Sequence, residues 1–191
     1  LTLKECLKVA NDVLLCLATI QDKMVHRDIK PSNILLLNGV WCLSDFGISR
    51  LLGEDTSEET LRRFRTPRYA SPEQLKGEPI RSPSDIYSFG VVFFECLYSK
   101  VPFTGPDVVH QHVNDYPVVP NSYGPGIRAL VQECLLKEPS SRPTASGLLL
   151  RLSALGATPD DPVTAMLLRA KEKIVETAAL DEQIWQDFAR K

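Results

Sequence analysis

The chain has 191 residues, of which 43% are hydrophobic and 24% charged, and its formal net charge at pH 7 is -2. This size and composition favour one compact domain with an appendage and exclude a largely disordered protein. The small net charge gives no bulk electrostatic reason to expect nucleic acid as a partner. We therefore predict no nucleic-acid binding and expect any charged ligand to be bound locally.

The cysteine and hydropathy patterns indicate a protein of the cell interior. The five cysteines are odd in number and lie among apolar neighbours without zinc-type spacing, so we predict reduced core thiols. The longest apolar run, residues 90–94, is far too short to cross a bilayer. The first residues of the sequence do not show the basic region followed by an apolar stretch that is typical of a signal peptide. We expect an intracellular, cytoplasmic protein with no membrane segment in this chain.

The first predicted element is a helix. Thr2 and Glu5 form a capping box, and apolar residues follow at helical spacing to near Gln21. Short apolar runs come next, around a polar loop and a turn at Asn38-Gly39. These runs predict small strands at residues 24–25, 34–37 and 40–43.

The middle of the chain combines a long loop with a buried helix. Residues 50–66 are polar and lack a period, which predicts a long exposed loop of the kind that is usually functional. From Ser82, with Pro83 at the first helical position, a helix that is apolar nearly all round runs to Leu97 and should be buried on every side. Amphipathic segments predict a mostly helical remainder at 106–113, 126–136 and 143–155.

The last part of the chain, residues 156–191, is predicted as a linker followed by an amphipathic helix. Asp161 is suited to the N-cap and Pro162 to the first helical position. Acidic and basic residues are mixed along this helix. The mixture favours a packing extension over a helix that recognises a partner or a membrane surface.

The polar loop after the first helix carries the residues suited to chemistry. Asp28 is followed by Lys30 and Asn33, so a base, a cation and a candidate metal ligand converge there. Phosphoryl transfer needs an oriented hydroxyl, neutralised charge at the transferring phosphate and a divalent metal held by oxygen ligands. Asp45, at a strand-to-loop junction, adds a carboxylate that suits Mg²⁺ together with the Asn33 amide oxygen.

These motifs resemble the eukaryotic-type protein kinase family, serine/threonine class. The run HRDIKPSN at residues 26–33 and the triplet DFG at 45–47 occur in the order and at the spacing of that family. Residues 66–73, TPRYASPE, look like the family's segment ending in Ala-Pro-Glu, and residues 84–90 look like its central buried helix. Arg142 completes the resemblance, which covers residues 1 to about 155.

The resemblance implies a fold class that is mainly α with small β-ribbons, namely a protein-kinase-like C-terminal lobe over residues 1–155. No Gly-x-Gly-x-x-Gly loop, strand lysine or helix with its glutamate partner occurs in the chain, so we expect the N-lobe β-sheet to be absent from it. The chain opens on Leu1, already close to a helical pattern, so we expect a truncation upstream. The missing N-lobe of the same polypeptide is then an expected partner.

The resemblance also implies roles at the site. Asp28 would be the proton acceptor for the substrate hydroxyl, Lys30 would steady the γ-phosphate of ATP, and Asn33 with Asp45 would bind Mg²⁺. Leu35 would lie beneath the adenine. Lys30, two residues after the aspartate, is similar to the serine/threonine pattern. The implied cofactors are ATP and Mg²⁺, and the implied substrate is a protein Ser or Thr hydroxyl.

Further residues take structural or regulatory roles by resemblance, and they are His26, Arg27, Phe46, Gly47, Thr66, Glu73, Asp85 and Arg142. His26 and Phe46 should stack within an apolar spine. Asp85 should hold the backbone of the catalytic loop, and Glu73 should form an ion pair with Arg142.

Activation-loop phosphorylation is a further expectation from the resemblance. Family members use the residue at Arg27 to grip a loop phosphate, and Thr66 matches the threonine that contacts the catalytic Asp and Lys. The candidate phosphorylation sites are Thr60 first, then Ser57 and Thr56. The arginines at 62–63 could equally pair with the glutamates at 58–59 as solvated charges.

Some residues depart from the family pattern or carry no function in it. Arg65, Ser71 and Tyr87 stand where the family usually has Gly, Ala and Trp, and none of these differences removes a catalytic group. His110 and His112 lie in a helical segment without a carboxylate or cysteine cluster, so we predict surface residues rather than metal ligands.

Two functional hypotheses follow. The first is a fragment of a serine/threonine protein kinase whose intact form transfers the γ-phosphate of ATP in signalling, while this chain alone is inactive for lack of the N-lobe. The alternative is a non-catalytic, truncated kinase-like module for binding or regulation. A reading frame that starts at Leu1 would favour the alternative, whereas an upstream Gly-rich loop and strand lysine would favour the enzyme.

Overall fold

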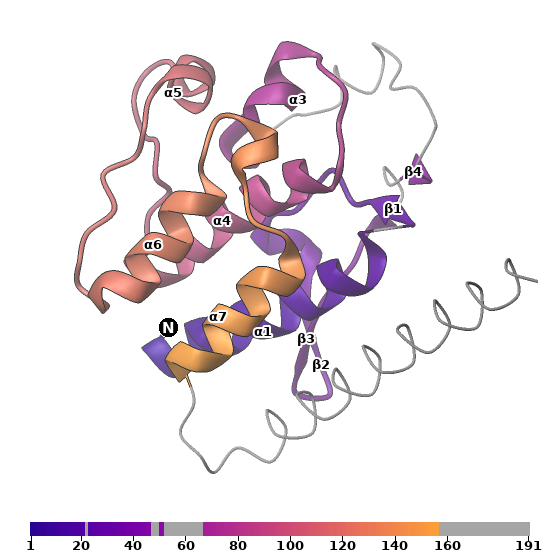
Figure 1. The fold of residues 1–191 in the computed structure, drawn as a ribbon, viewed down its shortest axis with the longest axis vertical. Helices are drawn as coiled ribbons and strands as arrows, with labels where there is room; N and C mark the ends of the chain where they lie inside the picture. The colour runs from indigo at the N-terminus through magenta and orange to yellow at the C-terminus, as the bar shows by residue number, and fades with distance from the viewer. Residues whose placement is uncertain (22, 47–49, 52–66, 157–191) are drawn as a thin grey trace, which may run out of the picture. The chain divides into compact units, whose positions relative to one another are not determined.

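A computed structural model of the chain describes residues 1–21, 23–46, 50–51 and 67–156. Over these ranges the fold is mainly helical with two small antiparallel strand pairs, as predicted (Figure 1). None of the helices in these ranges is both long and apolar enough to cross a bilayer. The helix predicted from Asp161 onward lies outside the described residues.

Helix α1 (Leu3–Ile20) begins at the predicted capping box. The Thr2 hydroxyl accepts a hydrogen bond from the Glu5 backbone N–H at 3.3 Å, and the Glu5 carboxylate accepts one from the Thr2 N–H at 2.7 Å. The helix ends at its C-cap Gln21, where the sequence predicted the end. Its apolar residues recur at helical spacing and form the buried face: Cys6, Val9, Ala10, Val13, Leu14 and Leu17.

Strands β2 (Ile34–Leu37) and β3 (Val40–Leu43) form the predicted hairpin. The two turn residues have positive φ, 50° at Asn38 and 81° at Gly39, which is the Asn-Gly turn that matches the twist of paired strands. β3 packs against α1. The hairpin is thereby fixed to the first helix.

A second pair joins β1 (Met24–Val25) to β4 (Arg50–Leu51), antiparallel. The prediction of a loop over residues 50–66 is therefore wrong for its first two residues. The pairing depends on a strand 25 residues earlier, so a local reading of polarity did not reveal it. Residues 52–66 lie outside the described residues.

Helix α4 (Ser82–Tyr98) is the centre of the fold and contacts α1, β1 and the later helix α6 (Figure 1). Every residue from 84 to 94 is buried, which confirms the prediction of a helix enclosed on nearly every side. Gly90 permits a close approach to α6, because a Cβ at this position would lie 2.5 Å from the Cβ of Cys134.

The remaining elements are short 3₁₀-helices and α-helices: η1 (Pro31–Asn33), η3 (Pro67–Tyr69), α3 (Pro72–Lys76), α5 (Val108–Asn114), α6 (Gly124–Cys134), η4 (Pro139–Ser141) and α7 (Ala145–Gly156). α5, α6 and α7 confirm the three predicted amphipathic segments, with ends shifted by one or two residues. All five cysteines are free, as predicted; Cys6 and Cys134 are buried and the other three are half-buried.

Candidate active site

The loop at residues 26–33 is held in shape by Asp85 of α4. One carboxylate oxygen of Asp85 accepts the backbone N–H of His26 and the other accepts that of Arg27, both at 2.8 Å. Arg27 has a φ of 72°, a conformation that a residue with a side chain adopts at a cost of about 1 kcal/mol, so an external restraint is needed. Burial raises the pKa of Asp85 to about 7. The two backbone N–H groups and the charge of Arg27 lower this pKa, but by less than burial raises it.

His26 connects this loop to the segment that follows β3. The ring is fully buried, and burial lowers its pKa, so it is neutral at pH 7. Its Nδ1 lies 3.4 Å from the backbone N of Asp28, which donates to it, so Nε2 carries the proton and donates to the Ser44 carbonyl at 3.0 Å. The ring also meets Phe46 edge-on, with centroids 4.8 Å apart. His26 and Phe46 are thus in contact, as the resemblance implied.

Asp28 lies at the centre of a small polar cluster. Its Oδ2 accepts the Lys30 Nζ at 2.7 Å and the Asn33 Nδ2 at 3.1 Å, and the same Asn33 amide also donates to the Asp28 carbonyl at 2.8 Å. The side chains of Asp28 and Lys30 are 16% and 29% exposed, so a ligand can reach them. The three predicted catalytic residues therefore form one hydrogen-bonded cluster, in which Lys30 and Asn33 orient the carboxylate of Asp28.

Asn33 and Asp45 offer oxygen atoms for a hard cation. The Ser44 backbone N–H and hydroxyl donate to the Asn33 carbonyl at 2.8 and 3.2 Å, which ties the end of β3 to the loop. Asp45 follows directly, exposed and with a φ of 59°. Because the Asn33 Nδ2 faces Asp28, its Oδ1, which accepts a long hydrogen bond of 3.5 Å from the Ser32 hydroxyl, is the end that suits a ligand.

This donor set fits Mg²⁺, which is commonly held by one or two carboxylates together with substrate phosphates. The described part of the chain contains no group of three or more His, Cys, Asp or Glu arranged around a metal position. A closed, all-protein metal site is therefore not built from these residues. A cation shared with a bound nucleotide is the arrangement that their chemistry suits.

A buried ion pair joins Glu73 of α3 to Arg142, which follows η4, beside the start of α4. The Arg142 guanidinium donates to both carboxylate oxygens of Glu73, at 2.6 and 2.8 Å, and the Ser84 hydroxyl donates to the same carboxylate at 2.6 Å. Burial raises the pKa of Glu73, but Arg142 and Ser84 lower it by more, so the net shift is downward. The pair predicted from the resemblance is therefore present and ionised at neutral pH.

Two anchors of the loop were missed by sequence reasoning. The Gln74 side chain donates a hydrogen bond to the Arg27 carbonyl at 2.8 Å, and the Ser44 carbonyl accepts one from the Nε2 of His26. A signal existed for Gln74, because it closes a capping box with Ser71 at the start of α3. Its second role depends on a contact 47 residues away and has no local signal.

The other predicted residues vary in what the structure describes. Leu35 lies on β2 and is 43% exposed, so it presents apolar surface, and its contact with adenine stays a prediction. Arg27 is buried. Five predicted residues lie outside the described residues: Gly47, Thr56, Ser57, Thr60 and Thr66.

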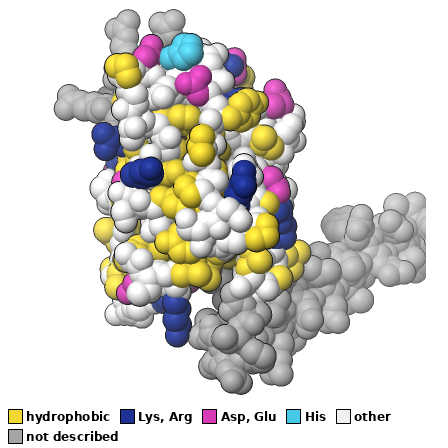
Figure 2. Space-filling view, turned by 90° about the vertical axis from the view of Figure 1, so that its left-hand side faces the viewer, with side chains coloured by type: hydrophobic (Ala, Val, Ile, Leu, Met, Phe, Trp, Pro, Cys, Tyr) yellow, Lys and Arg dark blue, Asp and Glu magenta, His cyan; other side chains and the backbone are white. Residues whose placement is uncertain are grey.

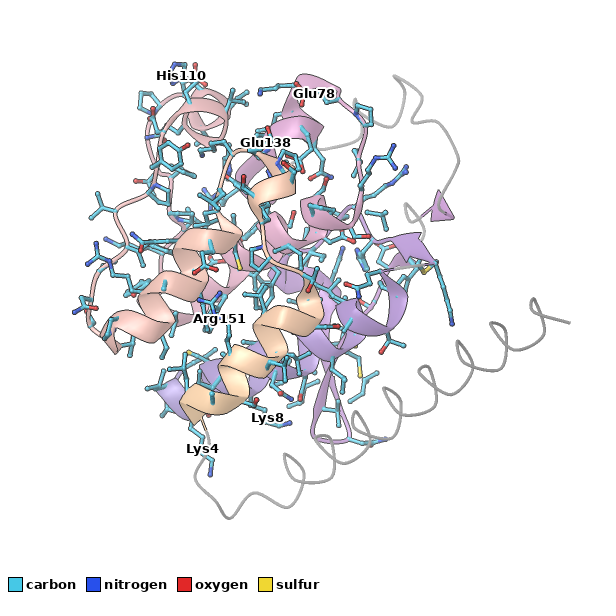
Figure 3. The ribbon with its side chains drawn as sticks, viewed as in Figure 1. Lys4, Lys8, Glu78, His110, Glu138 and Arg151 are labelled. Carbon is cyan, nitrogen blue, oxygen red and sulfur yellow. The ribbon has the colours of Figure 1, made fainter. Side chains whose placement is uncertain are left out.

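The two histidines of α5 differ in their surroundings. His110 is exposed and points outward (Figure 3), as predicted. The prediction of a surface position for His112 is wrong, because its side chain is fully buried. Its ring packs edge-on against Phe103 at 4.8 Å, and its Nδ1 lies 3.0 Å from the Tyr87 hydroxyl. Tyr87 lies 25 residues earlier in the chain, on α4.

Residues 1–151 match the family profile of the protein kinase domain. The chain is 38% identical over 157 residues to the serine/threonine-protein kinase PknA of Corynebacterium glutamicum, which covers 78% of this chain and 34% of that protein.

Two further relatives are similar over shorter stretches. A probable serine/threonine-protein kinase of Streptomyces coelicolor is 40% identical over 129 residues, covering 62% of this chain and 19% of that protein. The serine/threonine-protein kinase PknB of Mycobacterium leprae is 38% identical over 132 residues, covering 64% and 21%. The chain thus spans from about a fifth to a third of the length of these curated relatives.

Proposed function

This chain belongs to the protein kinase family, and on that premise we propose that the protein transfers the γ-phosphate of ATP to Ser or Thr hydroxyls of proteins. The observation that carries the proposal is the convergence of Lys30 and Asn33 on the Asp28 carboxylate, in a loop whose backbone is fixed by Asp85. Relatives with the names of serine/threonine-protein kinases support the choice of acceptor.

Asp28 acts as the proton acceptor in this proposal. Its Oδ2 is held by two donors, so its other oxygen is available to a substrate hydroxyl. The hydroxyl donates to Asp28 as its oxygen attacks the γ-phosphorus. The bond from that phosphorus to the β–γ bridging oxygen breaks, ADP leaves with the bonding electron pair, and the hydroxyl proton passes to the carboxylate. Lys30, 2.7 Å from Asp28, carries the positive charge that offsets the charge on the transferring phosphoryl group.

Asn33 and Asp45 would hold Mg²⁺, which neutralises charge on the ATP phosphates when it is bound. Asn33 contributes an amide oxygen whose orientation is set by the bonds of its Nδ2 to Asp28. Asp45 contributes an exposed carboxylate directly after the Ser44 tether. The exposed Leu35 on β2 would supply the apolar surface under adenine.

We further propose regulation and context for this activity. Phosphorylation of the loop, at Thr60 first and then at Ser57 or Thr56, would be sensed by Arg27. The activity would require a Gly-rich loop and strand lysine supplied from outside residues 1–191, so these residues alone would not turn over ATP. Under the second hypothesis the same residues form a binding module without turnover. The intact set of catalytic side chains favours the enzyme.

The experiment compares Asp28→Asn with Asp107→Asn in the full-length protein that contains these residues. Asp107 is an exposed N-cap that Asn replaces with little loss, so its variant is a matched control for charge. We expect Asp28→Asn to abolish phosphate transfer without loss of folding and Asp107→Asn to behave as wild type. Near-normal transfer by Asp28→Asn would refute its role. ATP turnover by residues 1–191 that disappears in Asp45→Asn would refute the proposed dependence on another segment.

A further inference from the structure

Lys137 lies in the connection between α6 and η4, half-buried. Its ammonium donates hydrogen bonds to the carbonyl oxygens of His112 at 2.7 Å and Gln111 at 3.3 Å, and to the Tyr87 hydroxyl at 3.4 Å. Both carbonyls belong to the last turn of α5, the end of a helix that attracts a cation. One side chain therefore binds the end of α5 to the central helix α4.

Three aromatic rings surround the same ammonium. Its Nζ lies 4.7 Å from the ring centroid of Phe103 and 5.6 Å from those of Tyr87 and Tyr116. Phe103 precedes α5 in the chain, and Tyr116 follows it. A cation over aromatic faces is attracted by their quadrupoles. Lys137 is thus in contact with residues before, within and after α5.

Helix α5 in turn packs against η3 and against α3, the helix whose Gln74 contacts the 26–33 loop. His112, buried on α5, faces the backbone of Arg68 in η3, whose hydrogen bonding favours the protonated ring. Gln74 of α3 donates to the Arg27 carbonyl, next to Asp28. A continuous series of contacts therefore runs from Lys137 through α5 to the loop of the proposed base.

Lys137 is also in contact with the buried ion pair. The Arg142 guanidinium, which pairs with Glu73, donates to the Lys137 backbone carbonyl at 2.9 Å. Glu73 belongs to α3, so the backbone and the side chain of Lys137 approach α3 by two separate routes.

We propose that Lys137 is a positioning residue for the proposed kinase reaction: its ammonium fixes α5 against η3 and thereby shapes the protein-substrate side of the site. The proposal rests on the proposed function. Lys137 touches neither Asp28 nor Lys30 in the structure and takes no part in the chemical step. The side of the molecule that carries α5 and α6 also exposes many hydrophobic atoms (Figure 2), among them Val109, Tyr116 and Val118.

Burial opposes the positive charge of Lys137 in the fold. Burial lowers the pKa of Lys137 to about 8, with Arg142 also lowering it and Asp115 raising it. Because the folded chain binds fewer protons here than the unfolded chain, stability rises with pH between about 8 and the ordinary lysine value of 10.5. The charged form is therefore the less favourable one in the fold. The ammonium orients α5 through its hydrogen bonds to the carbonyls of Gln111 and His112 although burial opposes its charge.

The contact of the Lys137 ammonium with the end of α5, called the Lys137 clamp below, has a pH dependence that follows from the groups around it. The charged or titratable groups that face Lys137 are Asp115 at the end of α5, Arg142 after η4, His112, Tyr87 and Tyr116. The pKa of His112, lowered to about 4 mainly by burial, lies far below that of Lys137. Loss of the Lys137 proton is then the change that releases α5, and an arginine at this position would not release it.

The kinetic experiment compares Lys137→Met with Lys137→Arg in the full-length protein, with casein as the protein substrate. We expect Lys137→Met to raise KM for casein about fivefold or more, with KM for ATP within about twofold of wild type and no loss of thermal stability. We expect the wild-type KM for casein to rise above pH 8, whereas Lys137→Arg should have the wild-type KM at pH 7 and keep it above pH 8. A fall in kcat that parallels a lower thermal midpoint, or no change in any constant, would overturn the proposal.

A second measurement separates this proposal from the proposed function. Hydrogen exchange of residues 1–191 should be faster at the α5 amides of Lys137→Met than of Lys137→Arg, with the α1 amides unchanged. Wild-type protein that phosphorylates no substrate would refute the proposed function, and the exchange comparison would still decide whether Lys137 holds α5. Equal exchange at α5 in both variants would refute the clamp.

Discussion

Arg142→Met should show how much of the fold depends on the buried ion pair. The side chains of Arg142 and Glu73 are 0% and 3% exposed, and their two hydrogen bonds are short. Loss of the guanidinium leaves a buried carboxylate with Ser84 as its remaining side-chain donor. Breaking such a pair costs about 3–5 kcal/mol. Arg142 also donates to three backbone carbonyls, so we expect a loss at the upper end of that range.

The chain provides a matched control at its surface. Arg151 of α7, labelled in Figure 3, makes the same two-pronged contact with Glu133 of α6, but these side chains are 43% and 39% exposed. Solvent screens such a pair, and Arg151→Met should cost about 0.2–1 kcal/mol. The comparison holds residue type and geometry nearly constant and changes burial.

The pH dependence gives the sharper test. In wild type the pKa of Glu73 is below its ordinary value, so its stabilisation is present above about pH 4.5 and is lost as the pH falls. In Arg142→Met burial dominates and raises that pKa, so stability is lost as the pH rises. Urea unfolding from pH 4 to 7 should therefore show a difference between the two proteins that grows with pH. A constant difference, or one below about 1 kcal/mol at pH 7, would refute the reasoning.

Two further predictions concern packing and a buried histidine. Gly90→Ala should lower the free energy of unfolding by about 1–3 kcal/mol, since the new Cβ would lie 2.5 Å from the Cβ of Cys134. Gly147→Ala is the control and should not destabilise the protein, because its new Cβ meets only the Thr144 Oγ1, at 3.2 Å. Equal losses for the two variants in urea unfolding would contradict this prediction. Burial lowers the pKa of His112 to about 4, so the folded protein resists protonation of this ring. The free energy of unfolding of wild type should therefore fall by about 3 kcal/mol relative to that of His112→Gln as the pH falls from 6.5 to 4. Parallel curves of unfolding free energy against pH for the two proteins would exclude a neutral buried ring.

Local signals in the sequence predicted much of the fold. The capping box at Thr2, the proline near the start of α4 and the Asn38-Gly39 turn each act within a few residues, so their elements are where the sequence predicted them. The kinase resemblance, confirmed by the family profile over residues 1–151, added pairings across long separations. Glu73 and Arg142, 69 residues apart, are an example.

The errors have a common physical cause, because each depends on a contact with a distant segment. Strand β4 exists only through its pairing with β1. His112 is buried because Phe103, Tyr87 and Lys137 surround it, and its own helical segment is polar enough to indicate the surface. Gln74 could be predicted as a cap but not as an anchor for the Arg27 carbonyl. Local periodicity carries no information on such partners.

The most direct test of the central claim is phosphoamino acid analysis of a protein substrate labelled from γ-³²P-ATP by the full-length protein. Label should appear on serine or threonine, require Mg²⁺, and be absent with Asp28→Asn, because the cluster around Asp28 is the proposed point of hydroxyl activation. No label with wild type, label on tyrosine alone, or undiminished label with Asp28→Asn would contradict the account.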